Sequence, residues 1–514
     1  MEIDRRVFGR RSFLRACTRA GIASALLPGL AGEGWSLADS VTPETSHDPA
    51  HDPLRPQYHL LPQHNWMNDP NGPIWWKGKY HLFYQLNPHA AVWGDMHWGH
   101  AVSTDMVHWH HEPIALAPTP GGPDSEGCFS GSAVVYKGVP TVIYTGVQNA
   151  PPQNVTLHDA ANKLRETQML ATAADDNLLR WKKLDAPVIA APPAGMAVTG
   201  FRDPCPWQEA DGWYLGVGSG ERGKGGCVLL YRSQDLRHWE YLHPLAQGKP
   251  TGSSANDPVD SGDMWECPDF FEVDGRHCLL YSTERKVYWT TGDYDVREHR
   301  YTPTRQGILD YGAYYAPKSF LAPDGRRILW GWIPERRPEA EFSSAGWAGA
   351  MSLPRVLGVD ADGQLTMKVA AEAEKLRGAS VRQTLKSGTH RQKLESLRQE
   401  IALRLTPQTK TAAVRLLVAG QPAWQMQLDL AGHTAHCGDR SFPLPALKAD
   451  EPAVRLFLDA SVIEAFAGAT QAITGRCYTV QSGLTELEVA VDAGGGGELT
   501  RWPLAAISEN RLTA

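Results

Sequence analysis

The sequence predicts an all-β protein, built as a five-bladed β-propeller followed by a C-terminal β-sandwich. Two observations predict the propeller: a hairpin-like segment recurs five times, and the spacing of the copies leaves room for further strands in each repeat. A third observation, runs of alternating apolar and polar residues from about Val381 onward, predicts the sandwich. The Gly, Pro and Trp content, with little sustained helical periodicity, agrees with a fold made mostly of strands.

Each of the five segments has the pattern of two antiparallel strands joined by a tight turn. An apolar run is followed by a Gly-centred turn and a second β-prone run, as in NDPNGPIWWKGKYHLFYQ and ECPDFFEVDGRHCLLYST. Glycine supplies the positive φ that such turns require. The turn glycines are Gly78, Gly138, Gly212, Gly275 and Gly325.

The distances between these turns predict four strands in each repeat. Successive turn glycines are roughly 50 to 75 residues apart, which is enough for two more strands after each hairpin. A weaker repeat, STDMVHW, SQDLRHW and AADDNLLRW, follows three of the hairpins and fits the outer strands of equivalent blades. An all-β sandwich with unrelated hairpins is the alternative interpretation.

Residues 1–38 are predicted to be a twin-arginine-type export signal. Arg10 and Arg11 precede a mildly apolar stretch and a small-residue site that ends at Ala38. The apolar stretch is too short to span a bilayer of about 30 Å, so no membrane anchor is expected. We therefore expect export to the periplasm or the extracellular space, with a flexible stretch over 39–51. A cytoplasmic tail that happens to contain two arginines is the alternative.

The rest of the chain is predicted to form two domains, as a length of 514 residues suggests. The five repeats place the propeller at 52–357. A linker with a short helix is predicted at 358–380, because it contains the helix-forming run VAAEAEKLR. The sandwich is predicted at 381–508, where AVRLLVAG, WQMQLDL and LTELEVAVDA have the pattern of strands.

Charge, cysteine and histidine patterns exclude several classes of function. The formal net charge is -7 and the sequence has no runs of basic residues, so it shows no pattern typical of nucleic-acid binding. A neutral small molecule is the expected partner. Of eight cysteines, Cys17 lies in the predicted signal and the other seven are unclustered, which argues against a dense disulfide framework but leaves one bridge open. The histidines between His97 and His111 lie in strands whose residues alternate between faces, so we predict no metal site.

Three acids occur at one position of the repeat. The residue nine positions before each turn glycine is Asp69, Phe129, Asp203, Glu266 or Ala316. Innermost propeller strands run beside the central channel, so equivalent positions should point into a shared cavity. Three carboxylates in one cavity repel each other and are rarely kept for stability alone. Taken singly, Asp69 or Asp203 is explained equally well by an Asx-Pro turn.

Two carboxylates that face each other across about 5 Å suit retaining glycoside cleavage. At an effective dielectric near 20, two charges at that distance repel by about 3 kcal/mol, which keeps one group protonated near neutral pH. Glutamate has a higher intrinsic pKa than aspartate. We therefore expect Glu266 to be the general acid/base and Asp69 the ionised nucleophile.

Three motifs around these acids resemble the signature blocks of glycoside hydrolase family 32, the invertases and fructanases. They are WMNDPNG at Trp66–Gly72, FRDP at Phe201–Pro204 and WECPDF at Trp265–Phe270. Further matching stretches include HLFYQ, VWG, FSGS, DYG and the LPR at Leu353–Arg355. Taken together and in order, these blocks cover nearly the whole chain after the signal.

The resemblance implies a retaining β-fructofuranosidase that releases terminal fructosyl residues from sucrose or short fructans through a covalent fructosyl-enzyme, without a cofactor. Asp69 matches the family's nucleophile, Glu266 its acid/base and Asp203 its transition-state stabiliser. Among the matching substrate-binding positions, the aromatic residues correspond to an apolar rim for the sugar. Without the motif, packing in the core would explain each of these aromatic residues equally well. The matching substrate-binding positions are Trp66, Asn68, Gln85, Trp93, Phe129, Ser130, Arg202 and Asp310.

One departure from the family bears on the substrate. In plant-like sucrose-cleaving members the fourth residue of the block at Asp310 is often Lys, which helps the Asp to hold the glucose side; here it is Ala313. Preference for sucrose over longer fructans therefore stays open, as does the balance between hydrolysis and transfer. The alternatives are a fructosyltransferase, an exo-fructanase of the inulinase or levanase type, and a non-catalytic sugar-binding propeller. The sequence predicts no oligomeric state.

Overall fold

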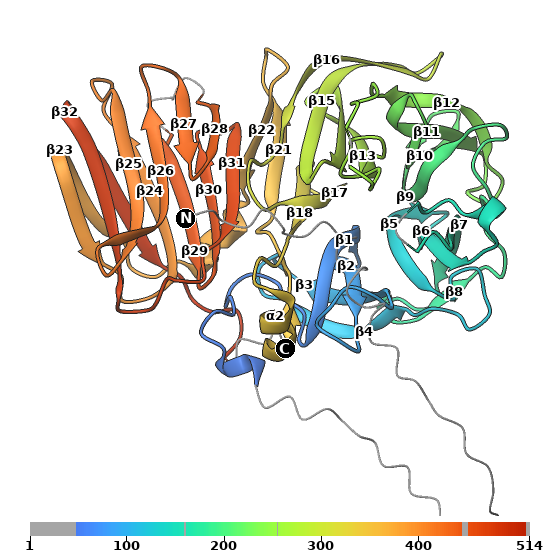
Figure 1. Ribbon diagram of the computed structural model, residues 1–514, viewed down its shortest axis with the longest axis horizontal. Coiled ribbons are helices and arrows are strands. Elements are labelled where there is room, and N and C mark those ends of the chain that lie inside the picture. Colours follow the sequence, from blue (N-terminus) through green and yellow to red (C-terminus); the bar gives the residue numbers. More distant parts are fainter. Residues whose placement is uncertain (1–47, 159–160, 254, 445–450, 510–514) are drawn as a thin grey trace, which may run out of the picture.

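The computed structural model describes residues 48–509, apart from 159–160, 254 and 445–450. It is an all-β structure with a ring of five blades and a two-layered C-terminal domain beside it, as predicted (Figure 1). The predicted export signal lies outside the described residues, as does most of the stretch predicted to be flexible. The last three residues of that stretch differ from the prediction and form a 3-10 helix, η1 (Pro49–His51).

Each blade is an antiparallel sheet whose first strand lies beside the central channel. Short turns join the strands, and a second 3-10 helix, η2 (Pro152–Asn154), lies within the second blade. In order from the first blade to the fourth, the strands are β1 (Asn65–Trp76), β2 (Lys79–Asn87), β3 (His97–Ser103) and β4 (His110–Leu116); β5 (Gly127–Tyr136), β6 (Val139–Asn149), β7 (Leu164–Ala173) and β8 (Trp181–Lys183); β9 (Val198–Glu209), β10 (Gly212–Glu221), β11 (Gly225–Ser233) and β12 (Glu240–Gln247); β13 (Glu266–Val273), β14 (Arg276–Thr283), β15 (Lys286–Asp295) and β16 (Arg300–Ile308).

The chain that follows the fifth hairpin closes the ring. That hairpin is formed by β17 (Tyr315–Leu321) and β18 (Arg327–Ile333), and β17 contacts both β13 and β1. The chain then forms helix α2 (Glu339–Ala345) and two short strands, β19 (Trp347–Ala348) and β20 (Ala350–Met351). β19 pairs in parallel with β1 and β20 pairs with β18, so this segment joins the fifth blade to the first.

The propeller ends later than predicted. β21 (Arg355–Val359) pairs with β18, and β22 (Leu365–Val369) pairs with β21, so both are outer strands of the fifth blade. The predicted boundary at 357 falls inside β21, because the closing segment separates the fifth hairpin from its outer strands. The short helix expected in the linker is the 3-10 helix η3 (Ala371–Leu376).

Two long strands run through both layers of the C-terminal domain. β32 (Thr485–Pro503) pairs with β25 through its first half and with β24 through its second, and β23 (Val381–Lys393) runs beside it. β32 changes its partner from β25 to β24 within a run of glycines. A Cβ added to Gly497 of this run would lie 2.2 Å from the carbonyl oxygen of Arg404, so the two backbones approach closely there. The other strands are β24 (Arg398–Leu405), β25 (Thr411–Val418), β26 (Gln421–Asp429), β27 (Thr434–Cys437), β28 (Arg440–Pro443), β29 (Val454–Asp459), β30 (Val462–Ala467) and β31 (Gln471–Arg476).

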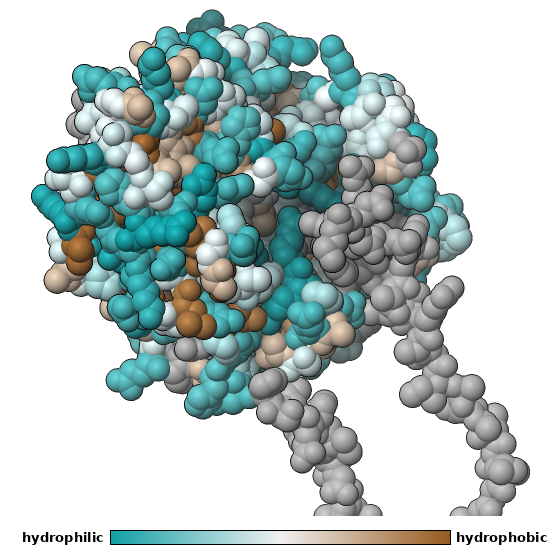
Figure 2. Space-filling model, turned by 60° about the vertical axis from the view of Figure 1, so that its left-hand side comes forward, coloured by the Kyte–Doolittle hydropathy of each residue, from teal (hydrophilic) through white to brown (hydrophobic). Residues whose placement is uncertain are grey.

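The face in Figure 2 is mostly hydrophilic, and its hydrophobic residues are scattered rather than gathered in one patch. Exposed apolar side chains include Val381 and Leu484 of the C-terminal domain. Within the described ranges, no helix is both long and apolar enough to cross a membrane.

A buried ionic cluster, which we call the interdomain cluster, joins the propeller to the C-terminal domain. Arg355 of β21 donates to Asp310 (3.0 Å) and to Glu464 of β30 (2.7 Å). Glu464 also bonds His59 (3.0 Å), whose other ring nitrogen bonds Asp459 (2.8 Å). Burial alone would lower the pKa of His59, but its two carboxylate partners raise it to about 9. A protonated imidazole therefore holds the two acids together.

Candidate active site

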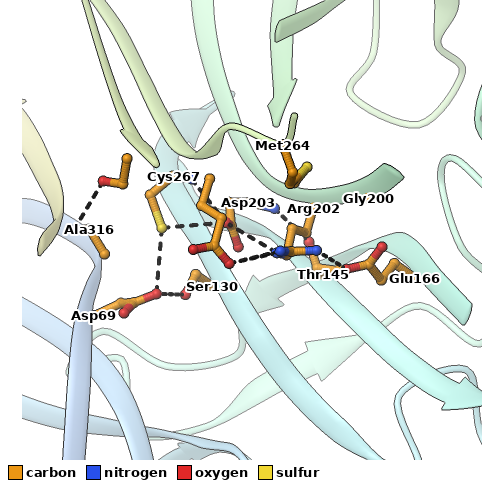
Figure 3. A network of polar contacts seen from close by, with 12 residues as sticks. Asp69, Ser130, Thr145, Glu166, Gly200, Arg202, Asp203, Met264, Cys267 and Ala316 are labelled. Carbon is orange, nitrogen blue, oxygen red and sulfur yellow. Dashed lines mark hydrogen bonds and ion pairs between the residues drawn. The ribbon is translucent and has the colours of Figure 1, made fainter. Parts of the chain in front are cut away.

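A β-bulge occurs in the innermost hairpin of every blade. In each hairpin two residues of the first strand lie opposite one residue of the second, at 68–69, 129–130, 203–204, 267–268 and 316–317. Asp203, Cys267 and Ala316 adopt positive φ at these bulges, a conformation that side chains with a Cβ rarely take. Bulges bend a strand and redirect its side chains, and here side chains from different blades approach one another (Figure 3).

The three predicted acids come together at these bulges, although they do not share one register. Asp69 is the second residue of its bulge, Asp203 is the first residue of its own, and Glu266 precedes the bulge of β13. The distance from bulge to turn glycine varies between blades, so equal spacing from the turn does not mean an equivalent position. The sequence prediction of one repeated position was wrong in this detail.

Asp69 is fully buried and accepts hydrogen bonds from three side chains. Asn68 donates to its Oδ1 (2.9 Å), while the Ser130 hydroxyl (2.6 Å) and the Cys267 thiol (3.4 Å) donate to its Oδ2. The indole N–H of Trp66 donates to the Asn68 side-chain oxygen (2.7 Å), which turns the amide N–H toward the carboxylate. The side chain of Asp69 is therefore fixed in orientation, with donors on both oxygens.

The thiol of Cys267 links two of the three acids. Its Sγ lies 3.4 Å from Asp69 Oδ2 and 3.4 Å from Asp203 Oδ2, so these two carboxylates lie within twice that distance of each other. The Cys267 backbone N–H also donates to Asp203 Oδ2 (2.9 Å). The backbone N–H of Asp203 in turn donates to Thr145 Oγ1 (2.9 Å) in the second blade. Residues of four blades thus position one pair of carboxylates.

Glu266 is held by a guanidinium and a phenol. Its Oε1 accepts from Arg202 Nε (3.0 Å) and Nη2 (2.8 Å), and its Oε2 accepts from the Tyr315 hydroxyl (2.8 Å). Arg202 also donates to Glu166 Oε1 (2.6 Å), on the second blade. Burial would lower the pKa of Arg202, but the charges of Glu166, Glu266 and Asp203 hold it well above its usual value. Arg202 therefore remains a cation between the two glutamates.

Aromatic side chains surround these acids. Trp93 and Phe129 meet edge to face at 5.7 Å between ring centroids, and Trp66 packs against Trp332 (5.8 Å) and Phe342 (6.1 Å). All five belong to one apolar cluster that also contains Cys267 and Tyr315. The residues predicted to form an apolar rim, Trp66, Trp93 and Phe129, therefore lie in one hydrophobic cluster.

Two buried polar atoms near the acids have no protein partner within the described residues. They are the side-chain oxygen of Gln85 and the indole N–H of Trp93. Gln85 itself is fixed, because its Nε2 donates to the Cys128 carbonyl (2.9 Å). Buried polar groups are nearly always hydrogen-bonded in native proteins, so an acceptor and a donor are available here for water or for a polar ligand.

A model of the glycosyl hydrolases family 32 N-terminal domain matches residues 59–369. The chain belongs to this family. Sucrose-6-phosphate hydrolase of Escherichia coli is 37% identical over 457 residues, which cover 82% of this chain and 89% of that protein. Raffinose invertase of Escherichia coli is 39% identical over 342 residues, which cover 63% of this chain and 66% of that protein. The chain is therefore an invertase-like glycoside hydrolase, and the interpretation as a non-catalytic propeller is set aside.

Solved family 32 structures share the fold of the whole chain. The Bombyx mori GH32 beta-fructofuranosidase has a TM-score of 0.75 and 29% identity, covering 90% of this chain and 96% of that one. Fructan 1-exohydrolase IIa from Cichorium intybus has a TM-score of 0.71 and 28% identity, covering 88% of this chain and 98% of that one. A variant of the first was solved in complex with sucrose and a variant of the second with 1-kestose.

Two residues predicted to bind substrate have other contacts in this family 32 protein. Asp310 is buried in the interdomain cluster, where its Oδ1 accepts from the backbone of Gly312 and Thr474 and its Oδ2 from Arg355 and the Thr474 hydroxyl. It has no oxygen left for a leaving-group hydroxyl, so that prediction was wrong. Arg202 is also buried, and its contacts with Glu166 and Glu266 make it a positioning residue for Glu266.

The sequence reasoning missed several residues of this family 32 site. Tyr315 had a signal, because it precedes Ala316, the fifth residue at the repeated spacing, and it bonds Glu266. Glu166 lies on the third strand of its blade, where no repeat marks it, and only the folded sheet brings it to Arg202. Trp332 and Phe342 come from the fifth blade and the closing segment, which lie far along the chain from Trp66.

The histidines discussed above lie in separate contacts rather than around one point. His100 bonds His81 (3.0 Å), His111 bonds the Tyr84 hydroxyl (2.8 Å) and His108 bonds an aspartate. In the part of the chain that the structure describes, no group of three or more His, Cys, Asp or Glu could hold a metal ion. The seven cysteines from Cys128 to Cys477 are all buried and free.

Proposed function

We propose that this family 32 hydrolase releases terminal β-D-fructofuranosyl residues from sucrose and short fructans, with retention of configuration, through a covalent fructosyl-enzyme. The observation that carries the proposal is the convergence of Asp69, Asp203 and Glu266 around Cys267 and Arg202. Paired carboxylates in an aromatic pocket are the groups that retaining glycoside cleavage needs.

The reaction would proceed in two displacements. In the first, an oxygen of Asp69 bonds the anomeric carbon, C2, as the bond from C2 to the glycosidic oxygen breaks, and Glu266 gives its proton to that oxygen. In the second, Glu266 takes a proton from water, whose oxygen bonds C2 and displaces the Asp69 carboxylate. Each displacement inverts C2, so the product keeps the original configuration.

The charge of the site supports Glu266 as the acid. Three carboxylates surround one guanidinium and a fourth is joined to them through Cys267, and such an excess of negative charge favours the uptake of a proton. The side chains concerned are Asp69, Asp203, Glu266, Glu166 and Arg202. In the proposed mechanism Glu266 carries that proton, because glutamate has a higher intrinsic pKa than aspartate.

The remaining side chains would bind and orient the fructosyl unit. We assign Asp203 to the ring hydroxyls, where its charge stabilises the oxocarbenium character that develops at C2. Gln85 and Trp93 supply the buried acceptor and donor described above. Asn68 and Ser130 fix Asp69, and the aromatic rim covers the C–H face of the sugar.

The test combines a nucleophile variant with the stereochemistry of the product. We expect Asp69→Asn to lower kcat on sucrose by three orders of magnitude or more while the protein stays folded, because the change keeps the shape of the side chain. Asp185→Asn, at an exposed position, is the matched control. NMR of the first fructose released by the wild type should show the β-anomer. An α-anomer, or near-wild-type rates in Asp69→Asn, would refute the mechanism.

Sugar release separates the alternative activities of this site. Equal free glucose and free fructose from sucrose would favour hydrolysis, whereas an excess of glucose would indicate a fructosyltransferase. Faster cleavage of inulin or levan than of sucrose would indicate an exo-fructanase. Ala313, which stands where sucrose-cleaving members often have Lys, leaves the preference between sucrose and longer fructans open.

We also propose that the enzyme is exported by the twin-arginine route, on the basis of Arg10 and Arg11. Arg10→Lys combined with Arg11→Lys should keep the full-length protein in the cytoplasm, as measured by cell fractionation. Unchanged distribution in this variant would end the proposal.

A further inference from the structure

A pocket of about 600 Å³ lies at the end of the propeller channel that is opposite the candidate active site. It is lined by the innermost strands of all five blades, β1, β5, β9, β13 and β17. In each of these strands, the residues that contribute to the active site come at or before the β-bulge, and the residues that line the pocket come after it. Four residues of a strand span about 13 Å, so Asp203 and Trp207 of β9 lie well apart. The pocket is therefore separate from the active site.

A layer of buried polar side chains separates the two ends of the channel. Asp269 and Cys205 are the lining residues of β13 and β9 that lie nearest the bulges, and both are buried. The Asp269 carboxylate accepts from the Ser319 backbone N–H (2.8 Å) and from the Cys205 thiol (3.6 Å). Lys318, which is 1% exposed, donates to the Pro268 carbonyl (2.6 Å) in the same layer. A ligand in the pocket is therefore kept away from the catalytic carboxylates.

Two polar side chains that line the pocket have a buried atom without a partner. Among the described residues, the Ser319 hydroxyl and the Nε of Arg327 form no hydrogen bond. The guanidinium of Arg327 lies over the ring of Phe271, 4.6 Å from its centroid. Burial lowers the pKa of Arg327, and the nearby charge of Asp269 counteracts this effect. A hydroxyl and a guanidinium N–H are therefore available to water or to a polar ligand.

The walls of the pocket combine aromatic side chains with hydrogen-bond donors and acceptors. Trp75 of β1 and Trp207 of β9 both line it and are only partly buried. The Trp207 indole N–H donates to Glu209 Oε1 (2.9 Å), which fixes both side chains. The lining residues include more acids than cations, so a strongly anionic ligand is disfavoured. The other polar side chains of the walls are Ser132, Gln208, Glu272 and His277.

We infer that this pocket is a second, non-catalytic carbohydrate-binding site, which takes a neutral sugar. The hydroxyls of a sugar both donate and accept hydrogen bonds, and its C–H faces pack on aromatic rings. Ser319 and Arg327 bind the hydroxyls, while Trp75 and Trp207 contact the ring. The volume lies within the range of about 300–1,000 Å³ that is usual for small-molecule sites. The sugar has two possible sources, a free short sugar or a unit of a fructan chain. The inference goes beyond the proposed function and does not depend on it.

The first test uses fructose, which has no glycosidic bond, so that binding to the wild type is measured without cleavage. Equilibrium dialysis with radiolabelled fructose reports how much sugar the protein binds at saturation. We expect a second bound fructose beyond the one in the active site, and Arg327→Gln and Trp75→Ala each to weaken this second binding about tenfold or more. Arg297→Gln removes an exposed cation between β15 and β16 and should bind as the wild type does. Circular dichroism and Tm establish that each variant folds; Trp75 is partly exposed, so its variant serves if Arg327→Gln does not fold.

A second arm identifies the source of the sugar. Electrophoresis of Asp69→Asn in gels that contain levan measures retention on a fructan chain, with and without each pocket substitution. Retention that Arg327→Gln and Trp75→Ala reduce assigns the pocket to a fructan chain, whereas a second bound fructose without such retention assigns it to free short sugars. Fructose binding and levan retention that neither variant alters would overturn the inference. Cleavage of levan by Asp69→Asn would instead contradict the proposed function, and dialysis of the wild type would still report on the pocket.

Discussion

Arg202 in the propeller channel and Arg355 between the domains are each buried between two carboxylates. Arg202 joins Glu166 to Glu266, and Arg355 joins Asp310 to Glu464. The local chemistry is therefore the same, and the difference lies in what surrounds each arginine.

The interdomain cluster is internally complete. Three carboxylates face two cations, Arg355 and the protonated His59, and every oxygen of Asp310, Glu464 and Asp459 accepts at least one hydrogen bond. A buried ion network of this kind is costly to break at any one member, because the remaining charges lose their partners. Such a network is suited to holding the propeller and the C-terminal domain together.

The channel network has more acids than cations, and near it the Gln85 side-chain oxygen and the Trp93 indole N–H have no protein partner among the described residues. Its four carboxylates come from four blades, and three of them meet at backbone bulges, two of which have positive φ, at Asp203 and Cys267. Strain and surplus charge at one place are typical of sites where chemistry, rather than stability, determines the residues. The comparison predicts that variants of the two networks will differ in kind: loss of rate in one and loss of stability in the other.

After Asp69→Asn, the largest effect on rate should come from Glu266→Gln. Glutamine keeps the contact with Arg202 as an acceptor but cannot deliver a proton, so kcat/KM on sucrose should fall by about 10²–10⁴. A fructoside with a good leaving group, such as the p-nitrophenyl derivative, should suffer less, because its departing oxygen needs no proton. Steady-state kinetics on both substrates decide the matter, and equal losses would contradict the acid/base assignment.

The largest effect on stability should come from Arg355→Met. Methionine fills similar space but leaves Asp310 and Glu464 buried without their cation, which should cost about 3–5 kcal/mol in the free energy of unfolding. Urea denaturation measures this loss, and the exposed change Arg297→Met should stay within about 0.5 kcal/mol of the wild type. If Arg355→Met lost activity at full stability, the contrast between the two networks would fail.

A smaller, pH-dependent effect is expected from His59. Its pKa in the folded protein, about 9, lies above the ordinary value of 6.5, so its contribution is complete below about pH 6.5 and is lost as the pH rises through 9. The loss is about 3 kcal/mol. Urea midpoints at pH 6.5 and 9.5 should therefore differ less in His59→Gln than in the wild type, with the exposed His238→Gln as control. If the urea midpoints of the wild type and of His59→Gln changed equally between the two pH values, His59 would not be the titrating group.

The repeat and its acids could be predicted from the sequence, because hairpin turns and β alternation are local signals. The spacing from Gly78, Gly212 and Gly275 led to three acids that the fold brings together, even though the bulges place them at different registers. The role of Asp310 could not be predicted this way, since its partner Thr474 lies on a C-terminal strand whose docking no local pattern records. The fifth blade's outer strands were missed for a similar reason, because the closing segment interrupts that repeat.

The parallel pairing of β19 with β1 has a consequence for biosynthesis. The first blade leaves the ribosome early, yet the strand that covers the edge of β1 emerges only after all five hairpins have been made. Until then the edge of β1 at Asn65 and Trp66 stays unpaired, the kind of surface on which nascent chains associate wrongly. We expect the ring to close late and all at once, so that a ribosome stalled before Trp347 would carry blades but no finished propeller.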